Sequence, residues 1–205
     1  MALGRNSDMN RLDTSINCSP LIHPAGCALI IITPSLQDLA SISRDIRNSV
    51  RRNLFAIMAA AEIINVPMFL TSPGAEPGKH GLVKQLPKVA SSYREFIAGE
   101  YAFPWQSPVF TEAVTREDRT TLVLAGFWLE HQILATALHA LADSYDVYIL
   151  LDATPAKERG AARLSQDRLI QAGATPVVTS QVIHEWAAES SDAYRRAALS
   201  AFISK

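Results

Sequence analysis

The sequence predicts an α/β fold: a three-layer α/β/α sandwich around a mostly parallel central sheet of about six strands. Short apolar runs rich in β-branched residues alternate with longer segments of helical periodicity, which is the pattern of successive βαβ units. The first run, CALIII at Cys27–Ile32, is continuously apolar, as strands buried on both faces are. Helices are therefore expected on both sides of the sheet.

Each predicted element corresponds to one segment of the chain. The strands are expected at 27–32, 67–72, 93–98, 121–125, 147–151 and 176–179, with 93–98 the weakest candidate. An apolar stripe that runs from Leu39 to Ile64, with Arg47 and Arg51 away from it, predicts one long amphipathic helix. Further helices are expected at 108–117, 129–143, 157–172, 180–188 and 192–203.

Composition limits the class of protein. With 205 residues, 48% of them hydrophobic and 19% charged, the chain fits a flexible N-terminal arm (1–20) and a single domain (21–205). A net charge of −1 offers a nucleic acid no broad cationic surface, and no uninterrupted apolar run is long enough to span a membrane. Residues 1–15 contain no apolar signal segment, and Cys18 and Cys27 are too few for a disulfide framework, so a cytoplasmic location is expected.

The predicted topology also selects candidate site residues. In open parallel sheets, ligands bind beyond the carboxyl ends of the strands. The stretches that follow the predicted strands are 33–35, 72–73, 98–105, 126–132 and 152–154.

One of these stretches carries a family resemblance. The segment TTLVLAGFWLEHQILATALHALADSYDVYILLDAT (120–154) resembles the nucleophile-bearing part of the isochorismatase/nicotinamidase superfamily of cysteine hydrolases. CALIIITPS, INVPMFLTS, EYAFPWQSPVFTEAV and QAGATPVVTSQVIHEW resemble other family segments in the same order, so the resemblance covers about residues 22–190. It is strongest to the YcaC-like branch, and it implies the three-layer fold and a homo-oligomer.

The family's reaction, however, needs side chains that this chain lacks. The resemblance implies a cysteine nucleophile, an aspartate base and a nearby lysine or arginine. The matching positions hold Gln132, Thr33 and Ala98, which cannot supply a nucleophile, a base or a cation. Cys27 is no substitute, because it begins a strand at the opposite edge of the sheet. The sequence therefore predicts a degenerate triad and a non-catalytic protein that binds a small molecule or acts in assembly.

Aromatic residues are expected around the same site. The candidate pocket residues are Tyr101, Phe103, Trp105, Phe127, Trp128, Leu129, Glu130 and His131. The rings either line an apolar pocket for a small aromatic ligand, or close the site and pack against a neighbouring subunit.

Two alternatives remain open. Glu130 and His131 could act as a replacement acid/base pair in a hydrolase for a small amide, ester or vinyl ether, although an acidic residue in a helix's first turn is commonly structural. The chain could instead be a structural subunit whose 192–203 helix forms contacts. No cofactor or metal is expected, because the histidines are scattered and neither a Walker-type loop nor a dinucleotide fingerprint occurs. Asp152 is expected to be structural.

Overall fold

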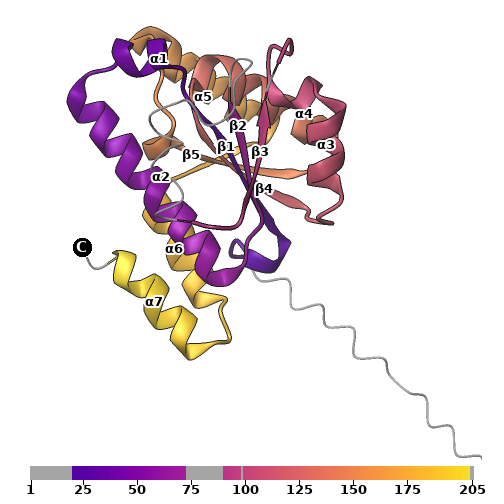
Figure 1. The fold of residues 1–205 in the computed structure, drawn as a ribbon, viewed down its shortest axis with the longest axis vertical. Helices are drawn as coiled ribbons and strands as arrows, with labels where there is room; N and C mark the ends of the chain where they lie inside the picture. The colour runs from indigo at the N-terminus through magenta and orange to yellow at the C-terminus, as the bar shows by residue number, and fades with distance from the viewer. Residues whose placement is uncertain (1–19, 73–89, 98, 204–205) are drawn as a thin grey trace, which may run out of the picture.

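A six-stranded sheet forms the middle layer of the structure (Figure 1). The computed structural model describes residues 20–72, 90–97 and 99–203. Its strands are β1 (Cys27–Ile32), β2 (Met68–Ser72), β3 (Tyr93–Ile97), β4 (Thr121–Gly126), β5 (Asp146–Leu150) and β6 (Thr175–Val177). They follow the order β3-β2-β1-β4-β5-β6, and every pair is parallel. The predicted parallel sheet is confirmed.

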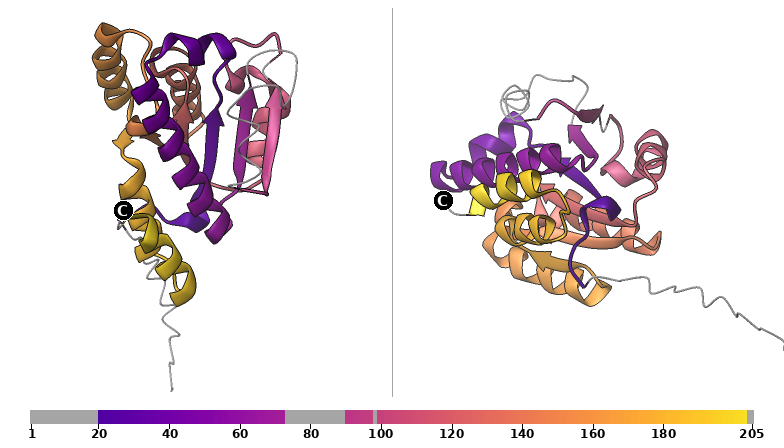
Figure 2. Two further views of the ribbon diagram at one scale, coloured as in Figure 1. Left: turned by 60° about the vertical axis from the view of Figure 1, so that its left-hand side comes forward. Right: turned by 90° about the horizontal axis from the view of Figure 1, so that it is seen from below.

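Helices cover both faces of this sheet (Figures 1 and 2). They are α1 (Leu36–Ser41), α2 (Arg44–Ile64), α3 (Pro108–Thr115), α4 (Leu134–Ala142), α5 (Arg159–Ala172), α6 (Thr179–Ala188) and α7 (Ala193–Ile203). Side chains of α2, α6 and α7 form one buried core with the sheet, whereas side chains of α3, α4 and α5 form the other. This arrangement is the predicted three-layer sandwich.

Strand β1 shows why its run is continuously apolar. Cys27, Leu29 and Ile31 enter the core on the α2 side, and the alternate residues enter the core on the α4 side. All six residues of β1 are buried. Because successive side chains of a strand point to opposite faces, a central strand covered on both sides has no solvated position.

The single long helix predicted from Leu39 to Ile64 is wrong in one respect, because the chain breaks it into α1 and α2. Ile42 adopts an extended conformation, and the Ser43 hydroxyl accepts a hydrogen bond from Ile46 N (3.4 Å) as the N-cap of α2. Ile46 is 48% exposed, so the buried stripe of α2 begins only at Val50. A serine that caps a new helix competes with continued helical pairing, and here it prevails.

Other boundaries differ from the predictions by a few residues. The helix expected at 129–143 consists of a π-helical turn (Leu129–Ile133) followed by α4, and β5 and β6 each begin one residue early. The predicted N-terminal arm, apart from residue 20, lies outside the described residues. None of the described helices is long and apolar enough to cross a membrane.

Candidate functional site

Thr33 lies directly after β1 and is fully buried. Its N–H donates to Thr71 O at 2.8 Å, and its hydroxyl lies 3.0 Å from the same oxygen and 3.1 Å from Ser72 Oγ. The Ser72 hydroxyl in turn faces Glu95 Oε1 at 3.4 Å. A threonine hydroxyl does not titrate near neutral pH. The position that the resemblance assigns to the base is therefore occupied by a neutral group bonded to the neighbouring strand.

The turn after β4 lies tightly against β1. Gly126 has φ +117°, and a Cβ built there would lie 2.0 Å from Ile32 O, so only glycine fits. The next residue, Phe127, donates its N–H to Ile32 O at 3.0 Å, and the peptide bond between Phe127 and Trp128 is cis. The turn places the π-helical residues Leu129–Ile133 at the carboxyl edge of the sheet.

Gln132, at the expected nucleophile position, lies in this π-helical turn and is partly buried. Its amide is not a nucleophile and does not ionise. Ala98, at the expected cation position, lies outside the described residues. Cys27 is at the start of β1, at the opposite edge of the sheet, and burial raises the pKa of its thiol to about 12. This cysteine is a protonated core side chain at neutral pH.

A carboxylate that the sequence analysis did not select stands at this edge. Asp38 belongs to a capping box in which its Oδ2 accepts hydrogen bonds from Ser35 N (2.8 Å) and Ser35 Oγ (2.7 Å). Its Oδ1 accepts a hydrogen bond from Trp128 Nε1 at 2.7 Å. Partial burial favours the neutral acid, but the bonds from Ser35 and Trp128 and the charge of Lys157 outweigh it and lower the pKa of Asp38. The carboxylate is thus ionised and links α1 to the turn after β4.

The Ser-x-x-Asp spacing of 35–38 is a recognisable helix-start signal. Its second role was not predictable, because Trp128 is 90 residues away in sequence.

Glu130 and His131 do not meet in a common site. Glu130 Oε1 accepts hydrogen bonds from the backbone N–H groups of Lys157 (2.7 Å) and Glu158 (3.1 Å), just before α5. The side chain of His131 is exposed. The glutamate therefore holds the loop after β5, whereas the exposed histidine is not directed with it into a shared cavity.

The expected single aromatic cluster is also wrong, because the rings divide between the two cores. Phe127 and Trp128 pack together, with centroids 5.1 Å apart, in the core on the α2 side. Trp105 enters the opposite core and donates a hydrogen bond from Nε1 to Asp143 Oδ2 at 2.8 Å. It also packs edge-on against Tyr145, 5.6 Å away. Asp143 follows α4 and Tyr145 precedes β5, so Trp105 extends toward the amino edge of the sheet.

The remaining candidates follow the same division. Phe103 lies 4.9 Å from the ring of His139 on α4, and Leu129 is buried in the α4-side core. Tyr101 is 37% exposed. Of the aromatic candidates, Phe127 and Trp128 directly adjoin the bonded network around Thr33 and Asp38.

Several buried polar atoms remain near the carboxyl edge. Thr71 Oγ1, Thr154 Oγ1 and Glu130 Oε2 are inaccessible and have no hydrogen-bond partner among the described residues. Asp152, by contrast, has partners, since its Oδ1 accepts bonds from Thr179 N (3.0 Å) and Thr179 Oγ1 (2.9 Å) at the start of α6. Asp152 is the structural residue that was predicted. The described residues contain no group of three or more acidic, histidine or cysteine side chains that could hold a metal.

Comparison with known proteins agrees with this geometry. Residues 102–181 match the family model described as the Isochorismatase domain. The chain therefore has an isochorismatase-like fold. Over 150 residues it is 29% identical to the probable hydrolase YcaC of Escherichia coli (strain K12), and the match covers 72% of this chain and 71% of that protein. The resemblance to the YcaC-like branch is confirmed.

Two solved structures share this isochorismatase-like fold. The MAR1 ribonuclease from Caenorhabditis elegans superposes with a TM-score of 0.77 at 18% identity, covering 90% of this chain and 93% of that one. The YcaC gene product from Escherichia coli, described as an octameric hydrolase of unknown specificity, superposes with a TM-score of 0.72 at 21% identity. That match covers 89% of this chain and 90% of the other. At these identities the likeness establishes the fold alone.

Proposed function

We propose that this isochorismatase-like chain is non-catalytic and acts as a small-molecule-binding or assembly protein. The observation that carries the proposal is the bonding of Thr33: a neutral, fully buried hydroxyl satisfied by β2 stands where the resemblance requires a base. The matching nucleophile position holds Gln132. Without a thiolate and a base, covalent hydrolysis of the family's type has no starting step.

Small-molecule binding is supported by the unpartnered polar atoms of the carboxyl edge. Thr71 Oγ1 and Thr154 Oγ1 belong to residues that are 2% and 3% exposed, and buried hydroxyls usually have a partner. A polar group of a ligand, or an ordered water, would satisfy them. This edge is also where open parallel sheets bind their ligands.

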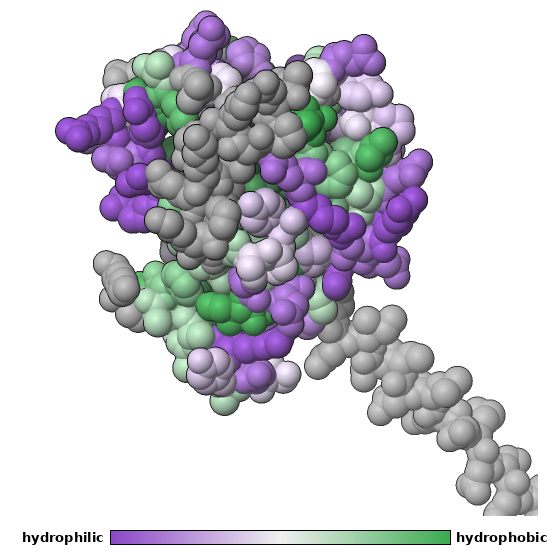
Figure 3. Space-filling model, in the orientation of Figure 1, coloured by the Kyte–Doolittle hydropathy of each residue, from purple (hydrophilic) through white to green (hydrophobic). Residues whose placement is uncertain are grey.

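Assembly is supported by helix α7 and by a relative. Figure 3 shows hydrophobic residues gathered where α7 lies in Figure 1. Tyr194 and Phe202 on this helix are 83% and 37% exposed, whereas Leu199 on the same helix is fully buried and packs within its own chain. The Escherichia coli YcaC structure is described as octameric, and we propose a homo-oligomer here as well.

The alternative of a hydrolase that uses Glu130 and His131 has less support. The glutamate is engaged by two backbone N–H groups, and the histidine side chain faces outward. An acid and a base must both reach the same reacting group.

Turnover measurements test the loss of catalysis. The purified chain and its Gln132→Ala variant are assayed with nicotinamide, isochorismate and N-carbamoyl substrates, and His131→Ala serves as the variant for the alternative. We expect no hydrolysis above the buffer rate from any of the three proteins. Turnover that disappears in Gln132→Ala would overturn the proposal, and turnover that disappears only in His131→Ala would establish the alternative.

Light scattering tests the assembly. We expect a mass in solution that is a multiple of the 22.4 kDa chain, and a Tyr194→Ser variant that shifts the distribution toward smaller species. A monomer at all concentrations would remove assembly from the proposal and leave ligand binding. Val109→Ser is a matched control, because Val109 is a comparably exposed apolar residue on α3.

A further inference from the structure

Arg119 has a buried nitrogen without a partner. The residue precedes β4, at the amino edge of the sheet and so opposite the site described above. Its Nη1 donates to Ala25 O in the short 3-10 helix Pro24–Gly26. Its Nε is inaccessible and has no hydrogen-bond partner within the described part of the chain. A guanidinium N–H that is withdrawn from bulk water normally donates to an acceptor, a water or an ion.

Arg119 lines a hollow of about 350 Å³, a volume that suits a small molecule. The apolar part of the wall is formed by Pro24, Ala25 and Ile64. The turn between α6 and α7 closes another side, and the first turn of α7 contributes a second guanidinium, that of Arg195. Two arginines therefore face one partly apolar hollow.

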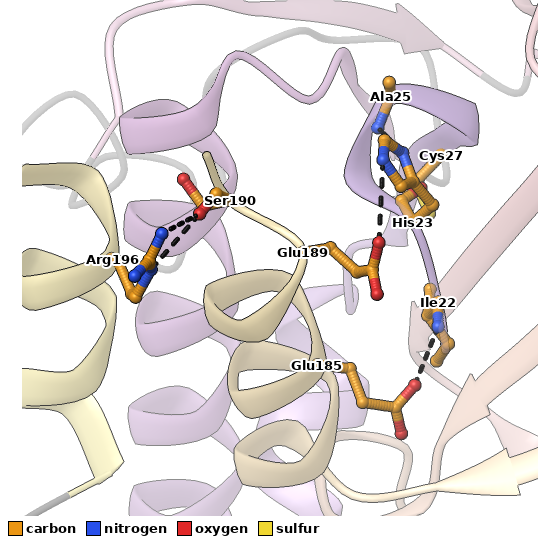
Figure 4. A network of polar contacts seen from close by, with 8 residues as sticks. All are labelled: Ile22, His23, Ala25, Cys27, Glu185, Glu189, Ser190 and Arg196. Atoms are coloured by element: carbon orange, nitrogen blue, oxygen red, sulfur yellow. Dashed lines mark hydrogen bonds and ion pairs between the residues drawn. The ribbon is translucent and has the colours of Figure 1, made fainter. Parts of the chain in front are cut away.

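The carboxylates of this hollow are already engaged. Asp192 Oδ1 accepts the N–H groups of Tyr194 (2.8 Å) and Arg195 (3.2 Å) at the start of α7, and its Oδ2 lies 3.8 Å from Arg195 Nε. Glu189 Oε2 points toward His23 Nε2, 3.7 Å away (Figure 4).

The surrounding segments are held in place as well. Arg196 donates from Nε (3.2 Å) and Nη2 (2.8 Å) to Ser190 O and fixes the turn between α6 and α7 (Figure 4). Ile22 N donates to Glu185 Oε2 at 2.8 Å, which holds the segment before Pro24 against α6. The hollow is thus bordered by anchored segments, and the two guanidinium groups that line it are those of Arg119 and Arg195.

We propose that this hollow binds a small monocarboxylic acid with an apolar body, through the guanidinium groups of Arg119 and Arg195. A guanidinium matches a carboxylate in geometry and charge. Helix α2 ends at this hollow, and α6 ends at the adjoining Ala188. The carbonyl ends of both helices and the side chains of Glu189 and Asp192 therefore add negative charge. A dianionic phosphate fits less well for this reason. The apolar wall accounts for the rest of the ligand.

Benzoate is a suitable probe, observed through the Nε–H resonances of arginine in a ¹H–¹⁵N spectrum. The resonance of Arg119 is assigned by its loss in Arg119→Lys. We expect the Arg119 resonance to shift saturably as benzoate is added. We expect Arg195→Gln to raise the dissociation constant for benzoate about tenfold, the usual consequence of losing one charged contact. Arg195 is 40% exposed, so this variant should retain the fold. Arg168→Gln on the outer surface of α5 should leave the constant unchanged.

Three results would overturn the proposal. One is a linear, unsaturated shift of Arg119, which would make its role purely structural. Another is equal weakening by Arg195→Gln and Arg168→Gln, which would indicate a general charge effect. The third is tighter binding of inorganic phosphate than of benzoate, which would contradict the monocarboxylate assignment.

Discussion

Replacing Thr33 by aspartate introduces the residue type that the family resemblance assigns to this position, and we expect it to destabilise this chain. Thr33 is 0% exposed, and its nearest polar neighbours are a carbonyl, a hydroxyl and, beyond Ser72, the Glu95 carboxylate. A carboxylate buried among acceptors has its pKa raised by about 3 units. At about 1.4 kcal/mol per unit, Thr33→Asp should lose about 4 kcal/mol of unfolding free energy at pH 8.

The pH dependence distinguishes this electrostatic effect from a change of shape. The pKa of the introduced carboxyl group would be higher in the folded than in the unfolded state. The penalty is therefore complete above the folded-state pKa and disappears as the pH falls below the unfolded-state value near 4. Urea unfolding at pH 8 and at pH 5, monitored by tryptophan fluorescence, measures this loss of unfolding free energy. Thr33→Asn, which is equal in shape to Thr33→Asp but neutral, is the control. Equal stability of Thr33→Asp and Thr33→Asn at pH 8 would refute the reasoning, because it would reveal a cation at this position.

Three further predictions concern the surrounding elements. Gly126→Ala should lose at least about 3 kcal/mol of unfolding free energy, since its Cβ would lie 2.0 Å from Ile32 O at a positive φ; wild-type stability in urea would contradict this close approach. Trp128→Phe should lose about 1–2 kcal/mol at pH 7, because it removes a hydrogen bond to a charged group. Asp38 has a lowered folded-state pKa, so the loss should shrink as the pH falls through that pKa, and a pH-independent loss would exclude the bond as its cause. The thiol of Cys27, with its pKa raised to about 12, should resist a disulfide reagent at pH 8 until urea unfolds the chain, measured in a variant without the other cysteine; rapid reaction of the folded protein would disprove its burial.

The strands were predictable because their signal is local. The run Cys27–Ile32 and its later counterparts are recognised from a few consecutive residues, and burial on both faces follows from their continuity. The break at Ile42 and Ser43 was missed because the same apolar periodicity continues across it. At a helix cap, a side chain competes with the backbone for hydrogen bonding to an N–H group, and the apolar periodicity does not show which of the two forms the bond.

The site was less predictable than the fold because its contacts are distant in sequence. Trp105 was expected beside Trp128, since both follow predicted strands. In the structure its indole N–H is satisfied by Asp143 at the other end of α4, and this partner determines which core the ring enters. Asp38 was missed for the same reason, because only the folded chain brings it to Trp128.

The contacts of the carboxyl edge indicate how a chain with an isochorismatase-like fold holds this edge in shape. The turn after β4 is bonded to β1 through Phe127 N and Ile32 O, and to α1 through Trp128 and Asp38. Glu130, in the π-helical turn that follows, accepts hydrogen bonds from the two backbone N–H groups just before α5. These bonds join the segments that follow β1, β4 and β5, and none of them requires a thiolate or a cationic side chain. Under the proposed loss of catalysis, selection for a rigid edge alone would preserve these bonds, whereas selection for hydrolysis of the family's type would also have required an ionisable group in place of the Thr33 hydroxyl.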